Sequence, residues 1–283
     1  MPPAADRIVF ATDCVTVGAF RCATDHPSFR DSGPIRDDCF VFPRTAVVIE
    51  HADARPFVAD PTIVTLYNRE QRYERRAVSA TGDRCDWFAV SAGVLRSALV
   101  LRDPAAADAV RPIRFTHAPA DAMTYLEQRR LFVASASADA DPLAVEERII
   151  ALLDRVLALA YGQPPRAPRQ PLPRAGDLAN AAKQWIAPRV TDRLTLARIA
   201  RAVGCSVFHL CRSFHSATGL TLHAYRDQVR LRLALERLEQ GERDLSRLAL
   251  DVGYSSHSHF TAAFRRSFGK PPSAARKLLI VRG

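Results

Sequence analysis

Two segments in the last hundred residues of the chain are copies of one short unit. "LARIARAVGCS" (196–206) aligns with "LSRLALDVGYS" (245–255) at an offset of 49 residues. Beyond the turn the offset becomes 50, so that Phe214 matches Phe264 and Gly219 matches Gly269. Since similar sequences form similar supersecondary structures, the repeat predicts two folded units of the same kind in this part of the chain.

Each copy has the pattern of a helix-turn-helix. Apolar residues recur at i, i+3, i+4 and i+7 in the first helix, which places them on one core face: Leu196, Ile199, Ala200 and Val203, then Leu245, Leu248, Ala249 and Val252. A glycine follows, and it can adopt the positive φ that a tight turn requires. Because a second helix comes next in both copies, the pattern predicts two helix-turn-helix units.

The second helices, predicted over 206–218 and 256–268, have one apolar and one polar or basic face. Such a polar face can enter the major groove, bond to base edges and meet phosphates. A serine at each start can cap the helix, and the unpaired N–H groups there favour a phosphate. The residues expected to face DNA are Ser206, Phe208, His209, Cys211, Arg212 and His215 in the first copy, and Ser256, His257, Ser258, His259, Thr261, Ala262 and Arg265 in the second.

The positive charge of the chain is confined to the part that contains the repeat. Residues 1–176 hold 22 basic and 22 acidic residues, whereas residues 177–283 hold 18 basic and 8 acidic residues. The net charge of +10 therefore lies entirely in the last 107 residues. A solubility surface would not usually be restricted in this way, so the charge favours a polyanionic partner for this domain.

A proline-rich segment, "YGQPPRAPRQPLPRAG" (161–176), coincides with the change in charge. It cannot sustain a helix or an interior strand, so it predicts a linker between domains at 1–160 and 177–283. Short runs rich in Val, Ile, Thr and aromatics over 8–100 predict strands of a sandwich or barrel. Helices are predicted over 121–136 and 142–161, the latter with Asp141 as cap and Leu143, Ile149, Ile150, Leu153, Val156, Leu157 and Ala160 near helical spacing. Downstream of the linker the sequence predicts seven helices.

The composition restricts the class of protein further. The chain has 283 residues, 48% of them hydrophobic, which suits two domains with buried cores. It has no apolar run long enough for a membrane helix and no basic start followed by an apolar core, so we expect neither membrane insertion nor secretion. With no regular cysteine framework, the six cysteines are expected to be reduced thiols in a cytoplasmic protein.

The segment "DVGYSSHSHFTAAFRRSFGKPPSAAR" (251–276) closely resembles the signature of the AraC/XylS family of bacterial transcription regulators. "LTLARIARAVGCSVFHLCRSF" (194–214) resembles the first half of that family's DNA-binding domain. The resemblance covers about 177–280. It implies two helix-turn-helix units bridged by a helix at about 221–240, with both second helices in successive major-groove segments of one DNA face.

The resemblance also implies an α+β layout, with an N-terminal cupin-like β-barrel domain carrying C-terminal helices and an all-α DNA-binding domain after it. Many family members sense a small molecule and dimerise through the barrel domain. The implied partners are double-stranded operator DNA, RNA polymerase, a second copy of the chain and a small effector. The implied activity is sequence-specific transcription regulation without catalysis, metal or cofactor.

Two other functions would use residues of the N-terminal half. Cys85 in "GDRCDWFAV" is the best candidate for a catalytic thiol of a DNA-repair alkyltransferase, but it lies on a predicted strand without a nearby histidine. A metal site is conceivable in the N-terminal half, where Cys22 and His26 are four residues apart. Ordinary buried thiols and single histidines are favoured instead, because CxxC, HxH and HExxH motifs do not occur. The histidines and cysteines of this half are His26, His51, His117, Cys14, Cys22, Cys39 and Cys85.

Overall fold

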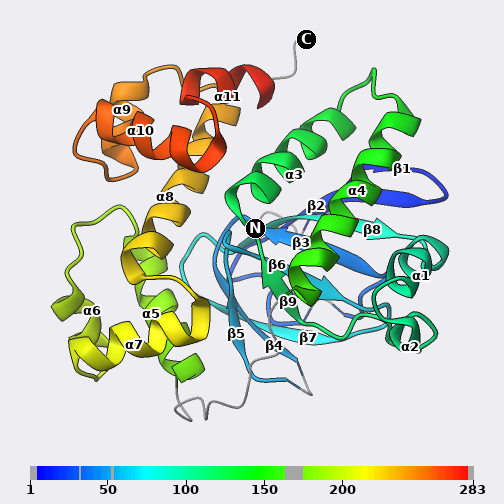
Figure 1. The fold of residues 1–283 in the computed structure, drawn as a ribbon, viewed down its shortest axis with the longest axis horizontal. Helices are drawn as coiled ribbons and strands as arrows, with labels where there is room; N and C mark the ends of the chain where they lie inside the picture. The colour runs from blue at the N-terminus through cyan, green and yellow to red at the C-terminus, as the bar shows by residue number, and fades with distance from the viewer. Residues whose placement is uncertain (1–4, 32, 52–53, 163–174, 280–283) are drawn as a thin grey trace. The chain divides into compact units, whose positions relative to one another are not determined.

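The computed structural model describes residues 5–31, 33–51, 54–162 and 175–279. The chain divides into two compact units, Met1–Pro164 and Pro165–Gly283 (Figure 1). The first unit holds all the described strands and the second is helical. Tyr161 belongs to the last helix of the first unit, and Ala175 and Gly176 open the first helix of the second. Most of the predicted linker, 163–174, lies outside the described residues.

The described strands of the first unit pair in two antiparallel sheets. One sheet has six strands in the order β1-β2-β8-β3-β6-β9, and the other has three in the order β5-β4-β7. The strands are β1 (Ala5–Ala11), β2 (Val15–Cys22), β3 (Cys39–Pro43), β4 (Val47–His51), β5 (Phe57–Ala59), β6 (Ile63–Tyr67), β7 (Tyr73–Ala77), β8 (Asp83–Val90) and β9 (His117–Pro119). The β domain is confirmed, but these pairings leave two separate sheets and not one closed barrel.

Side-chain alternation along β8 assigns the two faces of the larger sheet. Cys85, Trp87 and Ala89 point into a cavity that both sheets line. Asp86 and Phe88, between them, are buried on the opposite face. Because successive residues of a strand point to opposite faces, this one strand separates the cavity from the helices packed behind it.

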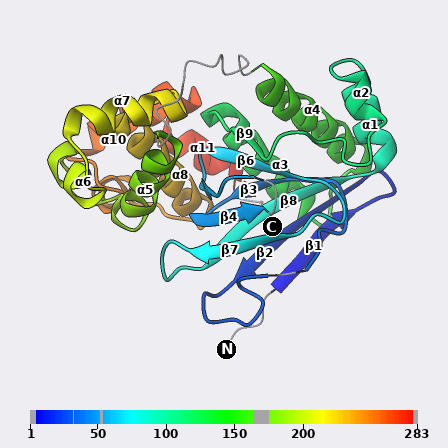
Figure 2. The same ribbon diagram turned by 90° about the horizontal axis from the view of Figure 1, so that it is seen from below.

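Helices cover the outer face of the six-stranded sheet (Figure 2). They are α1 (Ala92–Val100), α2 (Pro104–Ala107), α3 (Ala122–Ser135) and α4 (Pro142–Tyr161). Arg129 and Gln128 of α3 both bond to the Asp86 carboxylate, and the Arg129–Asp86 pair is almost completely buried. Arg148 of α4 bonds to Glu127 of α3 at 2.8 Å, so α4 is tied to the sheet through α3.

The predicted helices of this unit are confirmed, with changes at several residues. Asp141 caps α4 by accepting the Leu143 N–H, as predicted. Leu143 and Ile150 are exposed, whereas Val145 and Leu152 are buried in their place. Helix α1 occupies the end of the region predicted as strands, because the side chain of Ser91 caps it by accepting the Val94 N–H.

The second unit consists of the predicted helices, with a 3-10 turn after the first. They are α5 (Ala175–Ile186), η1 (Ala187–Arg189), α6 (Leu196–Ala202), α7 (Val207–Thr218), α8 (Leu222–Glu239), α9 (Leu245–Asp251), α10 (His257–Phe268) and α11 (Pro272–Leu279). Helices α6 and α7 form the first helix-turn-helix, and α9 and α10 form the second. A core of Ile199, Leu210, Phe214, Leu222 and Tyr225 holds the first together. Leu196, expected in that core, is 44% exposed.

Candidate nucleic-acid interface

Helix α7 presents the first polar face. The Ser206 hydroxyl caps it by accepting the His209 N–H at 3.2 Å, and Gly219 ends it in the left-handed region at φ 73°. Leu210 and Phe214 are fully buried, which turns the opposite side of the helix to solvent. Phe208 is 75% exposed, an unusual position for a large apolar side chain that the core does not need.

Helix α10 repeats this construction. The Ser256 hydroxyl accepts the His259 N–H, again at 3.2 Å, and Gly269 ends the helix at φ 70°. The apolar stripe of Phe260, Phe264 and Phe268 is fully buried, with ring centroids 5.7 and 4.6 Å apart along it. The other side carries a surface hollow lined by His257, Ser258, Thr261, Ala262, Arg265 and Arg266.

Polar contacts fasten α8 both to the segment that precedes the first helix-turn-helix and to the turn of the second. Nε of Arg230 donates to the Val190 carbonyl at 2.7 Å, and Nη2 donates to the carbonyls of Thr191 and Asp192 at 3.1 Å each. The Tyr254 hydroxyl, from the turn before α10, donates to the Asp227 carboxylate of α8. Because Leu222 and Tyr225 of α8 also pack in the core of the first helix-turn-helix, the orientation of α10 is set through a continuous helix.

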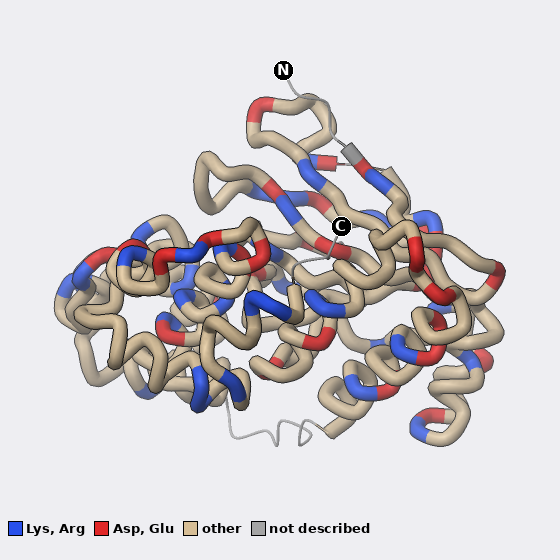
Figure 3. Tube along the Cα trace, turned by 90° about the horizontal axis from the view of Figure 1, so that it is seen from above, with Lys and Arg blue, Asp and Glu red and all other residues tan. Residues whose placement is uncertain are grey.

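The two recognition helices carry basic but no acidic side chains. Arg212 of α7 and Arg265 and Arg266 of α10 are exposed, and neither helix sequence contains Asp or Glu. Figure 3 marks the Lys and Arg positions along the helices of this unit. Both faces therefore have the sign of charge that attracts phosphates.

The predicted DNA-facing residues separate into two groups by exposure. Ser206, Phe208, Arg212 and His215 are exposed on α7, as are Ser256, His257, Ser258, His259, Ala262 and Arg265 on or beside α10, whereas His209, Cys211 and Thr261 are half-buried. Sequence reasoning missed Arg266, which lines the same hollow as Arg265. The helical projection places Arg266 only 100° from Arg265, so the pattern contained the signal for it.

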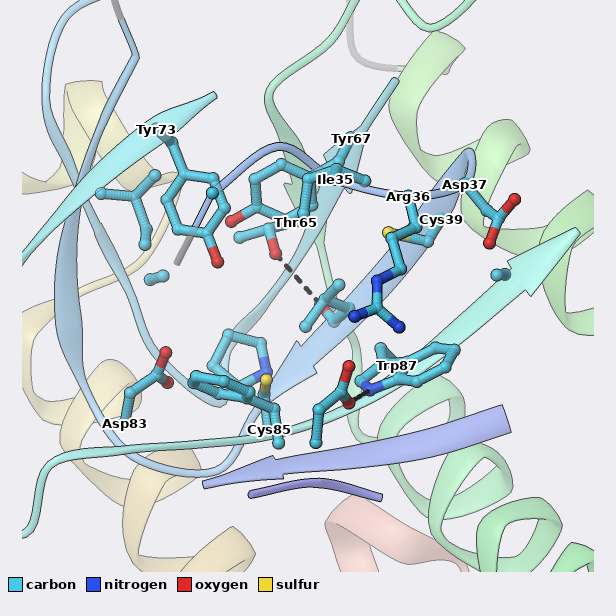
Figure 4. Close-up of a pocket in the computed structure, with 18 of the residues that line it drawn as sticks. Ile35, Arg36, Asp37, Cys39, Thr65, Tyr67, Tyr73, Asp83, Cys85 and Trp87 are labelled. Carbon is cyan, nitrogen blue, oxygen red and sulfur yellow. Dashed lines mark hydrogen bonds between the residues drawn. The ribbon is translucent and has the colours of Figure 1, made fainter. Parts of the chain in front are cut away.

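A cavity of about 420 Å³ lies in the first unit, between its two sheets (Figure 4). Its walls come from eight strands and from the loop at 33–37. Tyr67, Tyr73 and Trp87 supply aromatic surface. Burial raises the pKa of the Tyr67 and Tyr73 hydroxyls well above the ordinary value, so both remain protonated donors at neutral pH. Asp83, which also borders the cavity, is paired with the buried Arg75 at 2.6 Å.

Cys22, Cys39 and Cys85 of the first unit lie in surroundings that suppress thiolate formation. Burial, and then the neighbouring Asp83 and Asp86, raise the pKa of the Cys85 thiol well above its ordinary value. Burial raises the pKa of Cys39 in the same direction. All six cysteines, which lie within the described residues, are free thiols. The described residues contain no cluster of three or more His, Cys, Asp or Glu suited to a metal ion.

The C-terminal unit is similar in sequence to known transcription regulators. A family model described as a helix-turn-helix domain matches residues 199–278. Regulatory protein SoxS of Salmonella typhimurium is 36% identical over 96 residues, which are 34% of this chain and 90% of SoxS. The bifunctional transcriptional activator/DNA repair enzyme AdaA of Bacillus subtilis is 30% identical over 95 residues, 34% of this chain and 45% of AdaA. A crystal structure of ToxT from Vibrio cholerae aligns over 95% of this chain and 99% of its own, with 11% identity and a TM-score of 0.39.

Two capped helices with exposed basic faces, in repeated helix-turn-helix units, define a sequence-specific DNA-binding transcription regulator. The chain belongs to the AraC/XylS family of such regulators. Within the described residues, no helix combines the length and the apolar character that crossing a membrane requires.

Proposed function

We propose that this regulator reads its operator by placing α7 and α10 in successive segments of the major groove, and that a small molecule in the N-terminal unit adjusts that binding. The observation that carries the first part is the equivalence of the two helices. Both have a serine cap, a buried apolar stripe and a solvent-facing polar side with basic residues. Two equivalent helices, joined by the single helix α8, suit two major-groove segments on one face of the DNA.

The exposed side chains suggest different tasks in that interface. Arg212 offers a planar donor fork of the kind that pairs with guanine O6 and N7. Phe208 offers an apolar surface for a thymine methyl group. Ser206 and Ser256 stand where helix N-termini favour a phosphate, and Arg265 and Arg266 lie on the same exposed side of α10. The half-buried His209, Cys211 and Thr261 flank these groups and have less surface to offer a base edge.

The test of this interface is selection of DNA from a random library by the full chain. We expect a bipartite motif with two half-elements about 10 bp apart. Arg212→Ala is expected to alter one half-element, and Arg265→Ala the other or its backbone contacts. Selection of a single short motif that neither substitution changes would contradict the use of both helices.

The regulatory part of the proposal is supported by the position of β8. This strand lines the cavity with Cys85 and Trp87, while Asp86 bonds to Arg129 of α3 on its other face. A ligand that shifts β8 therefore also acts on α3 and, through Glu127 and Arg148, on α4. The exposed Leu143 and Ile150 of α4 suit pairing with a second copy. Two side-chain pairs, Asp86–Arg129 and Glu127–Arg148, would then connect the cavity to the dimer interface.

Deletion of residues 1–160 tests this regulatory role. Two DNA-binding domains held together occupy paired sites more tightly than single ones, because the second binding event is intramolecular. We expect the fragment to bind single sites like the full chain and to lose the cooperativity on paired sites. Equal cooperativity, with no small molecule changing either protein, would mean that the N-terminal unit does not regulate.

A purely regulatory role is favoured over alkyl transfer by the surroundings of Cys85. An alkyl-accepting thiol reacts as the thiolate, and this thiol has its pKa raised by burial and by two neighbouring acids. We propose that the protein is not an enzyme and works in the cytoplasm, with operator DNA and RNA polymerase as its macromolecular partners. The test is to incubate the chain with methylated DNA and to measure methyl transfer to the protein. We expect no transfer, and transfer to Cys85 would contradict the proposal.

A further inference from the structure

We propose that the effector of this regulator is a small apolar carboxylate, bound between the two sheets with its carboxylate on the guanidinium of Arg36. The proposal deepens the effector role above and rests on it. It starts from the loop at 33–37, which borders the cavity. The Arg36 side chain points from this loop into the cavity, whereas the neighbouring Asp37 carboxylate lies at the edge of the group and points away (Figure 4).

The loop holds Arg36 in place from both sides. Ile35 donates its N–H to the Gln71 carbonyl at 3.0 Å and accepts from the Glu70 N–H at 2.8 Å. Asp38 accepts the Arg69 N–H on its side chain at 2.9 Å and the Val90 N–H on its carbonyl at 3.1 Å. Arg36 therefore sits on a fixed backbone, although its own side chain is exposed.

The backbone conformation that supports this loop is itself uncommon. Glu70 has a φ of 62°, and among the described residues it is the one non-glycine with a positive φ. A non-glycine residue in the left-handed region costs free energy and tends to persist at functional sites. Its N–H is the group that bonds to Ile35, so the strained residue directly positions the rim of the cavity.

The hydrogen-bonding groups of the cavity are unequally satisfied. Of the three carboxylates that border the cavity, Asp83 is paired with Arg75 at 2.6 Å, Asp6 accepts from Trp87 Nε1 at 2.7 Å, and Asp37 points away from the cavity (Figure 4). The lining donor Arg36, by contrast, has neither an ion pair nor a hydrogen bond with another described residue. A cavity with spare donors and occupied acceptors selects a ligand rich in acceptors, and a carboxylate fits a guanidinium with two parallel bonds.

A second donor and the cavity walls define the rest of the ligand. The Tyr73 hydroxyl points into the cavity and has no hydrogen-bond partner among the described residues. The Tyr67 and Tyr73 rings, 4.9 Å apart, and the Trp87 indole form flat apolar surfaces, and Ile8, Val47 and Ile49 extend them. A cavity of about 420 Å³ is at the small end of the range for small-molecule sites, which suits a fused aromatic acid better than a long chain.

The test compares three probes on the full chain by isothermal titration calorimetry at pH 7. They are 2-naphthoate, its uncharged analogue 2-naphthamide, and octanoate as a flexible carboxylate of the kind that lipids release. We expect 2-naphthoate to bind at least about tenfold more tightly than the amide, as one charge-assisted contact provides, and more tightly than octanoate. Arg36→Gln is expected to abolish the preference for the acid over the amide.

Arg76→Gln is the matched control, since Arg76 is exposed on β7, pairs with Glu50 and does not line the cavity. It is expected to leave all three affinities unchanged. Equal binding of acid and amide, an unchanged preference in Arg36→Gln, or binding of none of the probes would overturn the carboxylate proposal. If the amide binds as tightly as the acid and shifts operator affinity, the regulatory role is supported and the carboxylate class of the ligand is wrong. If 2-naphthoate binds through Arg36 without changing operator affinity, the class stands and the regulatory role falls.

Discussion

Gly204 and Gly253 occupy the same position in the two helix-turn-helix units, and replacing each by alanine is expected to have unequal effects. Both glycines are left-handed, with φ of 71° and 88°. A Cβ at 204 would meet no heavy atom within 4 Å. A Cβ at 253 would lie 2.4 Å from Nη2 of Arg230 and 2.6 Å from the carbonyl oxygen of Thr191. Gly204→Ala therefore adds only conformational strain, whereas Gly253→Ala adds a collision as well.

The size of the difference follows from what Arg230 must give up. The strain of alanine in the left-handed region is about 1–2 kcal/mol at either position. At 253 the guanidinium must also move, and it donates to the carbonyls of Val190, Thr191 and Asp192. Each of these bonds contributes about 0.5–1.5 kcal/mol. We therefore expect Gly253→Ala to destabilise the second helix-turn-helix by about 2 kcal/mol more than Gly204→Ala destabilises the first.

Hydrogen exchange measured by mass spectrometry on the full chain distinguishes the two helix-turn-helix units, because each peptide reports its own opening free energy. Gly253→Ala should accelerate exchange in 245–268 by about 30-fold more than Gly204→Ala accelerates it in 196–218. Equal acceleration in the two units would refute the reasoning, since it would mean that Arg230 and the Thr191 carbonyl do not constrain the second turn.

Three further results are expected. Arg212→Ala should weaken operator binding by about 1–3 kcal/mol and relax preference at one base pair, as measured by competition with single-base variants; a uniform loss over all sequences would mark a phosphate contact instead. Tyr67 and Tyr73 have pKa values raised by burial, so their contribution to stability is complete below the unfolded pKa of about 10 and is lost as the pH rises above it. Ultraviolet titration should show these two tyrosines ionising only as the N-terminal unit unfolds, and their early ionisation in the folded protein would be inconsistent with the buried site. Cys85→Ser should leave operator binding within twofold of wild type, and loss of binding would assign the thiol a role that its half-buried position in the cavity wall does not explain.

Local signals in the sequence were sufficient for the helices of the C-terminal unit. Ser206 and Ser256 accept the N–H three residues ahead, and Gly219 and Gly269 take the left-handed conformation, so each boundary is determined within a few residues. The same holds for α4, which begins after Asp141. Periodicity predicted less reliably which side of a helix is buried, as the exposed Leu143 and Ile150 show. The reason is that a repeat of apolar residues does not tell where the neighbouring element lies.

The N-terminal site could not be predicted because its parts are far apart in the chain. Arg36, Tyr73 and Trp87 meet in one cavity only through strand pairing across the unit, and strand propensity contains no information on which strands pair. The stretch 68–78 is rich in arginine, a composition that predicts a solvated strand edge. Its strand β7 does lie at the edge of the smaller sheet, but Arg75 is buried against Asp83, a pairing that only the fold creates.

Helical phasing measures directly whether α7 and α10 both engage one face of the DNA. Once an operator is known from a genomic footprint, five base pairs inserted between its half-elements turn them to opposite faces. Since α8 joins the two helix-turn-helix units as one continuous helix, Leu222–Glu239, the protein cannot follow this rotation. We predict that specific binding is lost with five added base pairs. Unchanged affinity for the five-base-pair insertion would show that a single helix-turn-helix reads the site.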